Sequence, residues 1–131
     1  MFTFGVDLDV GSDDDHFHLG MTSYNLLKNI ELAGPNKGIF HLDCTYKIIK
    51  FNYLLIVFGL TDIERKIFTI CFMFSSHEQQ KDFDFFFTSL IDLCQKFDIN
   101  FSPEFLIIDA CKAMALSIKK NLIGCASFIC E

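Results

Sequence analysis

The chain has 131 residues, a hydrophobic fraction of 51% and a formal net charge of −6. This length and composition are sufficient for one packed domain or a part of one. No apolar run reaches the roughly 18 residues of a transmembrane helix, and the N-terminus lacks the basic and apolar regions of a secretory signal. We therefore expect a protein that neither spans a membrane nor is secreted.

The negative charge is concentrated near the N-terminus. Residues 1–34 contain six acidic residues and one lysine, whereas residues 35–131 contain eleven acidic and ten basic residues. We therefore divide the chain into an acidic N-terminal segment with a short helix (1–34) and a main domain (35–131). The main domain lacks the strongly basic composition that is typical of tight DNA binding.

The six cysteines are scattered, lie mostly within apolar patterns and include no Cys-x-x-Cys pair. A free cysteine behaves as a small buried hydrophobe, and a chain without a secretory signal is expected in a reducing compartment. We therefore expect buried thiols rather than disulfides or a zinc site built on cysteine.

The N-terminal segment is predicted to have little regular structure. Residues 1–18 indicate a short strand followed by an acidic loop, and Thr22-Ser23 can cap a short helix that extends to Asn29. His16 and His18 would lie on the same side of an extended segment and could bind a metal. Because no cysteine is nearby, a solvated acidic loop is the simpler interpretation.

The main domain reads as five strands and two helices. In chain order these are strands at 39–45, 52–60 and 66–74, a helix that starts after Ser75 or Ser76 and has its apolar face over 83–97, a strand at 105–108, a helix at 110–121 and a strand at 124–130. Short connections between the first three strands favour an antiparallel meander, and the later strand–helix–strand order favours right-handed crossovers. The order βββαβαβ predicts an α/β fold with a mixed five-stranded sheet, the ribonuclease-H-like layout.

Two details of the first long helix can be predicted. Ser75 and Ser76, followed by Glu78 and Gln79, offer two overlapping capping boxes at its start. Its phenylalanine-rich face over residues 83–97 belongs to the core, but we expect part of that face to be exposed. An oligomeric partner or a further C-terminal segment would then be needed to cover it.

Two aspartates end apolar runs, Asp43 after the first predicted strand and Asp109 after the fourth. In the predicted layout these two strands are adjacent and parallel, so both carboxylates would lie at the carboxyl-terminal edge of the sheet. Paired carboxylates are ligands for hard divalent cations. The alternative is that both aspartates only cap local turns.

Four blocks, in the same order, resemble the transposase domain of Mutator-like elements (MULE). They are Leu42-Asp-Cys-Thr-Tyr-Lys-Ile48, Tyr53-Leu-Leu-Ile-Val-Phe-Gly-Leu-Thr-Asp62, Phe74-Ser-Ser-His-Glu78 and Phe105-Leu-Ile-Ile-Asp-Ala-Cys-Lys-Ala-Met114. The resemblance covers residues from about His18 to Cys130. Cys44 stands where that family usually has glycine, and Cys130 resembles the first member of a Cys-x-x-His element.

The resemblance implies a nuclear DDE/D transposase of the ribonuclease-H-like superfamily that cuts and joins DNA with two Mg²⁺ or Mn²⁺ ions. Asp43 and Asp109 match the first two acidic metal ligands and catalytic residues. Candidate substrate-binding residues nearby are His41, Lys47 and Lys112.

The family's third acid belongs to a later helix that we do not find, so we expect a truncated copy with little activity. A non-catalytic DNA- or protein-binding adaptor of the same fold is the main alternative. An unrelated metal-dependent hydrolase would need its third carboxylate from Asp7, Asp9 or Glu131.

Overall fold

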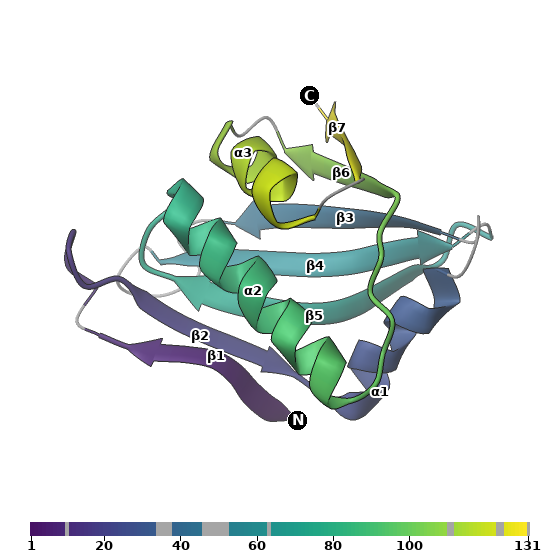
Figure 1. The fold of residues 1–131 in the computed structure, drawn as a ribbon, viewed down its shortest axis with the longest axis horizontal. Coiled ribbons are helices and arrows are strands. Elements are labelled where there is room, and N and C mark those ends of the chain that lie inside the picture. Colours follow the sequence, from purple (N-terminus) through teal and green to yellow (C-terminus); the bar gives the residue numbers. More distant parts are fainter. Residues whose placement is uncertain are drawn as a thin grey trace.

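The computed structural model describes residues 1–9, 11–33, 38–45, 53–62, 64–109, 112–122 and 125–130. These residues form one mixed sheet with helices packed against it (Figure 1). The described strands are β1 (Phe2–Leu8), β2 (Phe17–Thr22), β3 (Gly38–Thr45), β4 (Leu54–Asp62), β5 (Ile67–Ser75), β6 (Phe105–Asp109) and β7 (Ala126–Cys130). The described helices are α1 (Tyr24–Leu27), the 3-10 helix η1 (Lys28–Ala33), α2 (Gln80–Lys96) and α3 (Lys112–Asn121).

The strand order across the sheet is β1-β2-β5-β4-β3-β6-β7. Strand β3 pairs antiparallel with β4 on one side and parallel with β6 on the other. Strands β4 and β5 pair antiparallel, and β6 and β7 pair parallel. The mixed α/β sheet and the parallel neighbourhood of the first and fourth predicted strands, here β3 and β6, are confirmed.

The predicted number of five strands is wrong, because the N-terminal segment adds β1 and β2 to the β5 edge of the sheet. The sequence pattern predicts a short strand where β1 lies but a loop where β2 begins. In β2 the buried positions are His18, Gly20 and Thr22, so the face turned to the helices is polar. A strand with a polar buried face gives no hydrophobic signal on that face.

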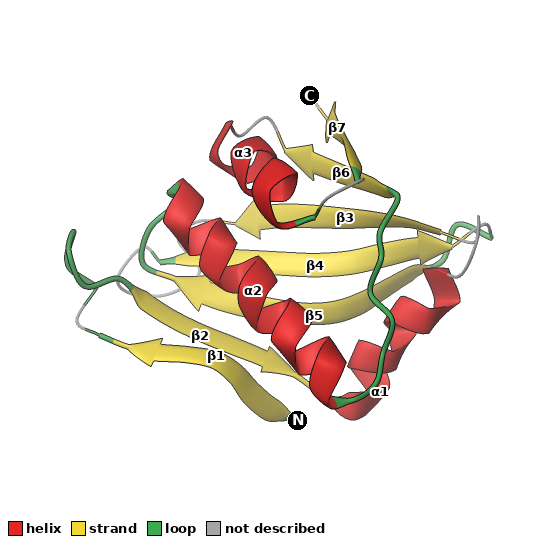
Figure 2. Cartoon of the chain, in the orientation of Figure 1, coloured by secondary structure: helices red, strands yellow, loops and turns green. Residues whose placement is uncertain are grey.

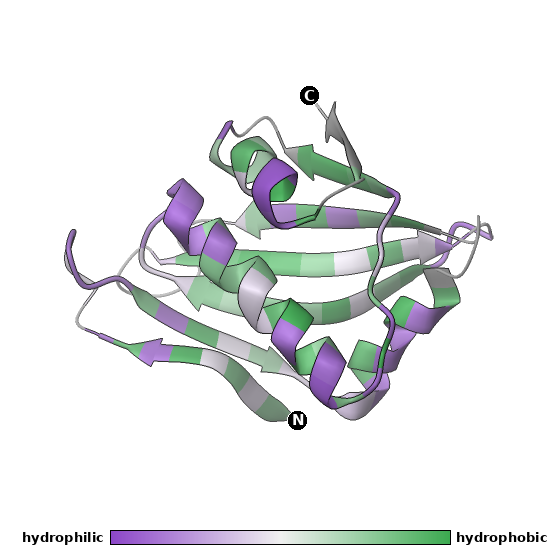
Figure 3. Cartoon of the chain, in the orientation of Figure 1, coloured by the Kyte–Doolittle hydropathy of each residue, from purple (hydrophilic) through white to green (hydrophobic). Residues whose placement is uncertain are grey.

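The core lies between the sheet and the helices, with α2 crossing the middle strands and α3 lying beside it (Figures 1 and 2). Strands β4 and β5 are largely hydrophobic along their length (Figure 3). Phe58 of β4 is fully buried, and its ring meets that of Phe86 of α2 edge-on at 5.9 Å. This packing fixes α2 across the sheet.

Most of the phenylalanine-rich face over residues 83–97 is buried, and of its phenylalanines only Phe97 shows the expected exposure. Phe83, Phe86 and Phe87 are all 0% exposed, while Phe97, just after the helix, is 38% exposed. The helices of the main domain and the sheet already enclose this face. The thiol of Cys94 on α2 is also buried, as predicted, and burial raises its pKa to about 12.

The start of α2 differs from the predicted capping boxes. The N-cap is Gln79, whose backbone N–H donates to Oδ2 of Asp82 at 2.9 Å. Ser75 remains in β5, and the Ser76 hydroxyl accepts a hydrogen bond from the backbone N–H of Phe17 at 2.8 Å. The two serines are therefore used by the sheet and by β2, which leaves Gln79 and Asp82 to cap the helix.

Strand β1 forms an irregular edge of the sheet. Its register against β2 shifts between Phe4 and Asp7, and Gly5 within the shift has a φ of +53°. Such a positive φ is favourable for glycine, and a bulge of this kind increases the local twist of a strand.

Candidate functional site

The carboxyl-terminal ends of β3 and β6 lie side by side. The paired residues run from Phe40 opposite Leu106 to Leu42 opposite Ile108. Asp43 and Asp109 follow these last paired residues by one position in each strand. The backbone of both predicted acidic residues therefore lies at the same edge of the sheet.

The Asp43 side chain is exposed, and a hydrogen bond at 3.0 Å from the backbone N–H of Cys44 reaches its Oδ1. The side chain of Asp109 and the whole of Lys47 lie outside the part of the chain that the structure describes. Lys112 begins α3 with an exposed side chain. Among the described residues, Asp43 thus has only this one hydrogen bond and is open to solvent, as suits a carboxylate that receives a hydrated ion.

His41 lies two residues before Asp43 and packs over the glycine of the neighbouring strand. A Cβ at Gly59 would approach Cε1 of His41 to 2.6 Å, so the absence of a side chain at Gly59 provides the space for the imidazole. Burial lowers the pKa of His41, and the nearby charge of Asp43 opposes this shift. Its Nε2 is buried and has no hydrogen-bond partner among the residues that the structure describes. The imidazole is therefore held neutral beside the carboxylate.

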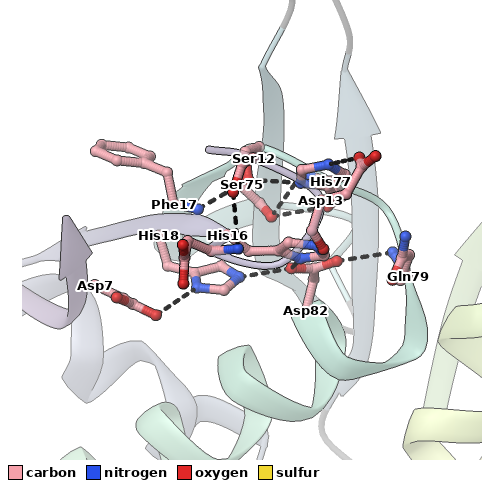
Figure 4. A network of polar contacts seen from close by, with 12 residues as sticks. Asp7, Ser12, Asp13, His16, Phe17, His18, Ser75, His77, Gln79 and Asp82 are labelled. Atoms are coloured by element: carbon pink, nitrogen blue, oxygen red, sulfur yellow. Dashed lines mark hydrogen bonds and ion pairs between the residues drawn. The ribbon is translucent and has the colours of Figure 1, made fainter. Parts of the chain in front are cut away.

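A second group of side chains that could bind a metal lies nearer the β1 edge of the sheet, where β2 meets the start of α2 (Figure 4). Nδ1 of His16 and Nε2 of His18 each lie 2.7 Å from Oδ1 of Asp82. The three residues are 5%, 4% and 0% exposed, respectively. These three ligand atoms lie within 4.8 Å of one another and could hold a metal ion.

Aromatic rings fix the two imidazoles in place. His77 stacks on His16 with ring centroids 3.7 Å apart, and Phe85 stacks on His18 at 4.3 Å. Burial raises the pKa of Asp82, but hydrogen bonds from His18, His16 and the backbone of Gln79 outweigh it and lower the pKa overall. Asp82 is therefore held as a carboxylate in a buried position.

The sequence indicated His16 and His18 as a pair but missed Asp82. Asp82 is 66 residues from His16 and 64 from His18, and no local pattern links them. The available signal was an aspartate at the third position of a helix whose apolar face covers the sheet. An acidic side chain there is held close to the sheet when it accepts a hydrogen bond from the backbone N–H of the N-cap residue.

Residues 39–131 match the family described as MULE transposase domain, which is more than two thirds of the chain. The chain belongs to the MULE transposase family. No curated protein matches the chain. The matched segment begins within β3 and includes the edge that carries Asp43 and Asp109.

Membership of the MULE transposase family gives the chain a transposase-related function and associates it with DNA and divalent metal. None of the helices in the described ranges is both long and apolar enough to cross a membrane. His16 and His18 precede the segment that matches the MULE transposase domain, whereas Asp82 lies within it. The buried cluster therefore joins the N-terminal segment to the transposase domain.

The strand order of the sheet excludes Asp7 and Asp9 as sources of a third carboxylate beside Asp43. Asp7 lies in β1 and Asp9 directly after it, and β2, β5 and β4 separate β1 from β3. Adjacent strands are about 4.8 Å apart, so four steps place β1 about 19 Å from β3. Asp7 and Asp9 cannot share an ion with Asp43, and Glu131 lies outside the described residues.

Proposed function

We propose that this chain carries part of a ribonuclease-H-like DDE/D transposase site, with Asp43 and Asp109 as its first two acidic ligands. The observation that carries the proposal is the parallel register of β3 and β6, which brings both residues to one edge of the sheet. The match to the MULE transposase domain spans this edge and supports the same assignment. The ancestral reaction would be metal-dependent DNA cleavage and strand transfer, in the nucleus.

The exposed carboxylate of Asp43 suits Mg²⁺ or Mn²⁺, because these ions prefer carboxylate and water oxygens and retain part of their hydration. When bound, a pair of such ions stabilises the attacking and leaving oxygens of a phosphodiester. Asp43 and Asp109 would be the residues of the chain that hold these ions. His41 and Lys112 would lie near enough to contact the DNA backbone.

We propose that the chain alone cleaves DNA slowly or not at all. Two acids hold one hydrated ion weakly, and the second ion requires a further ligand. The division into a segment of residues 1–34 and a transposase core of residues 35–131 remains part of this proposal. The family match beginning at residue 39 supports that division.

The proposal is tested by Mn²⁺ binding, followed through the electron paramagnetic resonance signal of the free ion. The wild-type chain is expected to bind Mn²⁺ weakly, and Asp43→Asn and Asp109→Asn to lose that binding. Asp92→Asn, an exposed carboxylate on α2, is the matched control and is expected to bind as the wild type does. Equal binding by Asp43→Asn and the wild type would contradict the assignment.

Nicking of supercoiled plasmid DNA with Mn²⁺ tests the expected lack of activity. If the wild-type chain nicks the plasmid and Asp43→Asn does not, the site is supported and the claim of low activity is wrong. Nicking that persists in Asp43→Asn would come from another site or from a contaminant.

The second candidate is a non-catalytic adaptor that binds DNA or protein through the same fold. One observation favours it: Leu55 and Val57 of β4, and Phe72 and Phe74 of β5, alternate with the core residues and remain partly exposed. An apolar sheet face of this kind can bind a protein partner. A partner that the wild type and the Asp43→Asn/Asp109→Asn variant retain equally well in pull-downs would support the adaptor.

A further inference from the structure

Two imidazoles and one carboxylate point at a common centre at the start of α2 (Figure 4). The atoms that face one another are Nδ1 of His16, Nε2 of His18 and Oδ1 of Asp82, all in buried residues. A buried carboxylate is costly unless a cation or hydrogen-bond donors compensate its charge. The chemistry of this centre therefore depends on what positive charge lies between the three atoms.

The ring nitrogens of His16 and His18 that face away from Asp82 indicate which nitrogen of each imidazole carries the proton. Nε2 of His16 lies 3.0 Å from the backbone carbonyl oxygen of Asp13, which can only accept, so this nitrogen carries a proton. In a neutral imidazole the other nitrogen, Nδ1, then presents its lone pair to Oδ1 of Asp82. Two lone pairs 2.7 Å apart repel each other, so a positive charge belongs between them: a second ring proton, as in the hydrogen bonds that lower the pKa of Asp82, or a metal ion in its place.

His18 is arranged like His16, with one ring nitrogen directed at Asp82 and the other directed at a different acceptor. Its Nδ1 is buried, has no hydrogen-bond partner within the described part of the chain and lies 3.6 Å from the carboxylate of Asp7. A proton on Nδ1 would be attracted to Asp7 and would leave Nε2 as a lone pair directed at Asp82. The second oxygen of Asp82 is already bonded to the backbone N–H of Gln79.

We propose that His16, His18 and Asp82 bind a divalent transition metal of the zinc class through Nδ1, Nε2 and Oδ1. Imidazole nitrogens with a carboxylate oxygen are ligands that suit zinc. Histidine ligands typically donate their outer N–H to a carbonyl or a carboxylate, and here Asp13 and Asp7 are placed to accept. Bonds of 2.0–2.1 Å in a tetrahedron would widen the ligand separations from 2.7 Å to about 3.3 Å.

The metal would connect parts of the chain that are distant in sequence. His16 immediately precedes β2, His18 lies in β2, and Asp82 lies in the first turn of α2. The site would thus fasten the N-terminal β1–β2 hairpin to the helix that covers the sheet. It is separate from the β3–β6 edge, because β5 and β4 lie between β2 and β3.

Zinc binding to the purified full chain tests the proposal, with thiols kept reduced and affinity measured by isothermal titration calorimetry. The wild type is expected to bind one zinc ion per chain and to melt at a higher temperature with zinc than with a chelator. X-ray absorption is expected to show nitrogen and oxygen ligands at about 2.0–2.1 Å and no sulfur at about 2.3 Å. Sulfur ligands, or no bound zinc, would overturn the proposal.

Substitutions locate the bound ion. His16→Gln and His18→Gln are expected to abolish stoichiometric binding, whereas His41→Gln, which removes a histidine from β3, is the matched control and keeps it. Wild-type affinity in His16→Gln would contradict the proposal.

A milder variant avoids the risk that a buried substitution unfolds the chain. The Asp7 side chain is 38% exposed, so Asp7→Asn is expected to fold normally and to weaken zinc binding by about 10- to 100-fold. Asp14→Asn removes an exposed charge from the same acidic segment and is expected to leave the affinity unchanged. Equal affinities for Asp7→Asn and Asp14→Asn would show that Asp7 does not orient His18 for a metal. This result would overturn the proposed role of the contact between Asp7 and Nδ1 of His18.

Discussion

Asp82 and Asp43 are both aspartates beside a histidine, yet their surroundings are opposite. Asp82 is fully buried, and its two oxygens face two imidazoles and a backbone N–H. Asp43 is exposed. Its side chain accepts one hydrogen bond from the described residues, from the backbone N–H of the next residue, Cys44, at 3.0 Å. The first carboxylate is part of the folded structure, whereas the second is available to ligands from solution.

This difference follows from what each position requires. A buried carboxylate without partners would destabilise the fold, so the partners must be present in the folded chain. A carboxylate that is to bind a hydrated ion and a phosphate must stay accessible to both. Loss of Asp82 is therefore expected to affect mainly stability, and loss of Asp43 mainly the proposed binding of a hydrated ion from solution.

The largest effect is expected from Asp82→Ala. The change leaves two buried imidazoles facing a cavity and removes the carboxylate that caps α2, so we expect a loss of about 3–5 kcal/mol in the free energy of unfolding. Urea denaturation of the chelator-treated protein measures it. Asp43→Ala is the control and is expected to stay within about 0.5 kcal/mol of the wild type; similar losses in both variants would remove the distinction between the two sites.

An intermediate effect is expected from Asp84→Ala, two residues further along α2. Oδ1 of Asp84 accepts hydrogen bonds from Ser117 and Asn121 of α3, at 2.6 and 2.7 Å. Loss of these bonds is expected to cost about 1–3 kcal/mol in urea denaturation. Asp92→Ala on the exposed side of the same helix is the control, and a cost equal to that of Asp92→Ala would show that the α2–α3 contact contributes nothing.

A comparable or smaller effect is expected from Gly59→Ala on the Asp43 side of the sheet. The new methyl group would meet Cε1 of His41 at 2.6 Å and the carbonyl oxygen of Phe68 at 3.0 Å, so the imidazole must move. We expect a loss of about 1–2 kcal/mol in the free energy of unfolding. Combining it with His41→Ala should restore part of the loss; a double variant as unstable as the sum of the singles would show that His41 does not fill this space.

The smallest effect is expected from Mg²⁺ on thermal stability. A ligand at a concentration equal to its dissociation constant stabilises the folded state by about 0.4 kcal/mol. Differential scanning calorimetry should therefore show a small rise in melting temperature with Mg²⁺ that is lost in Asp43→Asn. A rise that persists in Asp43→Asn but is lost in Asp82→Asn would assign the Mg²⁺ effect to the buried cluster instead.

The elements that rest on apolar runs could be predicted from the sequence. The strands of the main domain and the parallel pairing of β3 and β6 followed from their hydrophobic patterns and short connections. Strand β2 could not, because its buried face consists of His18, Gly20 and Thr22. Its stability in the sheet comes from tertiary contacts such as the hydrogen bond from Thr22 to the carbonyl of Ile70, at 2.7 Å.

The candidate sites divide in the same way. Asp43 and Asp109 stand directly at the ends of apolar runs, so their common edge is visible in the sequence. The partnership of Asp82 with His16 and His18 depends on contacts 64 and 66 residues apart and on which residue caps α2. The cap was predicted at Ser75 or Ser76, and both serines have other roles in the folded chain.

The irregular register of β1 also restricts how copies of this chain can associate. A regular exposed strand offers evenly spaced amide and carbonyl groups to which an incoming strand can add, and this is a common route to aggregation. The shift between Phe4 and Asp7 interrupts that spacing, and the acidic side chains of Asp7 and Asp9 repel an identical strand. Continuous sheets that run from one molecule to the next through β1 are therefore disfavoured at neutral pH.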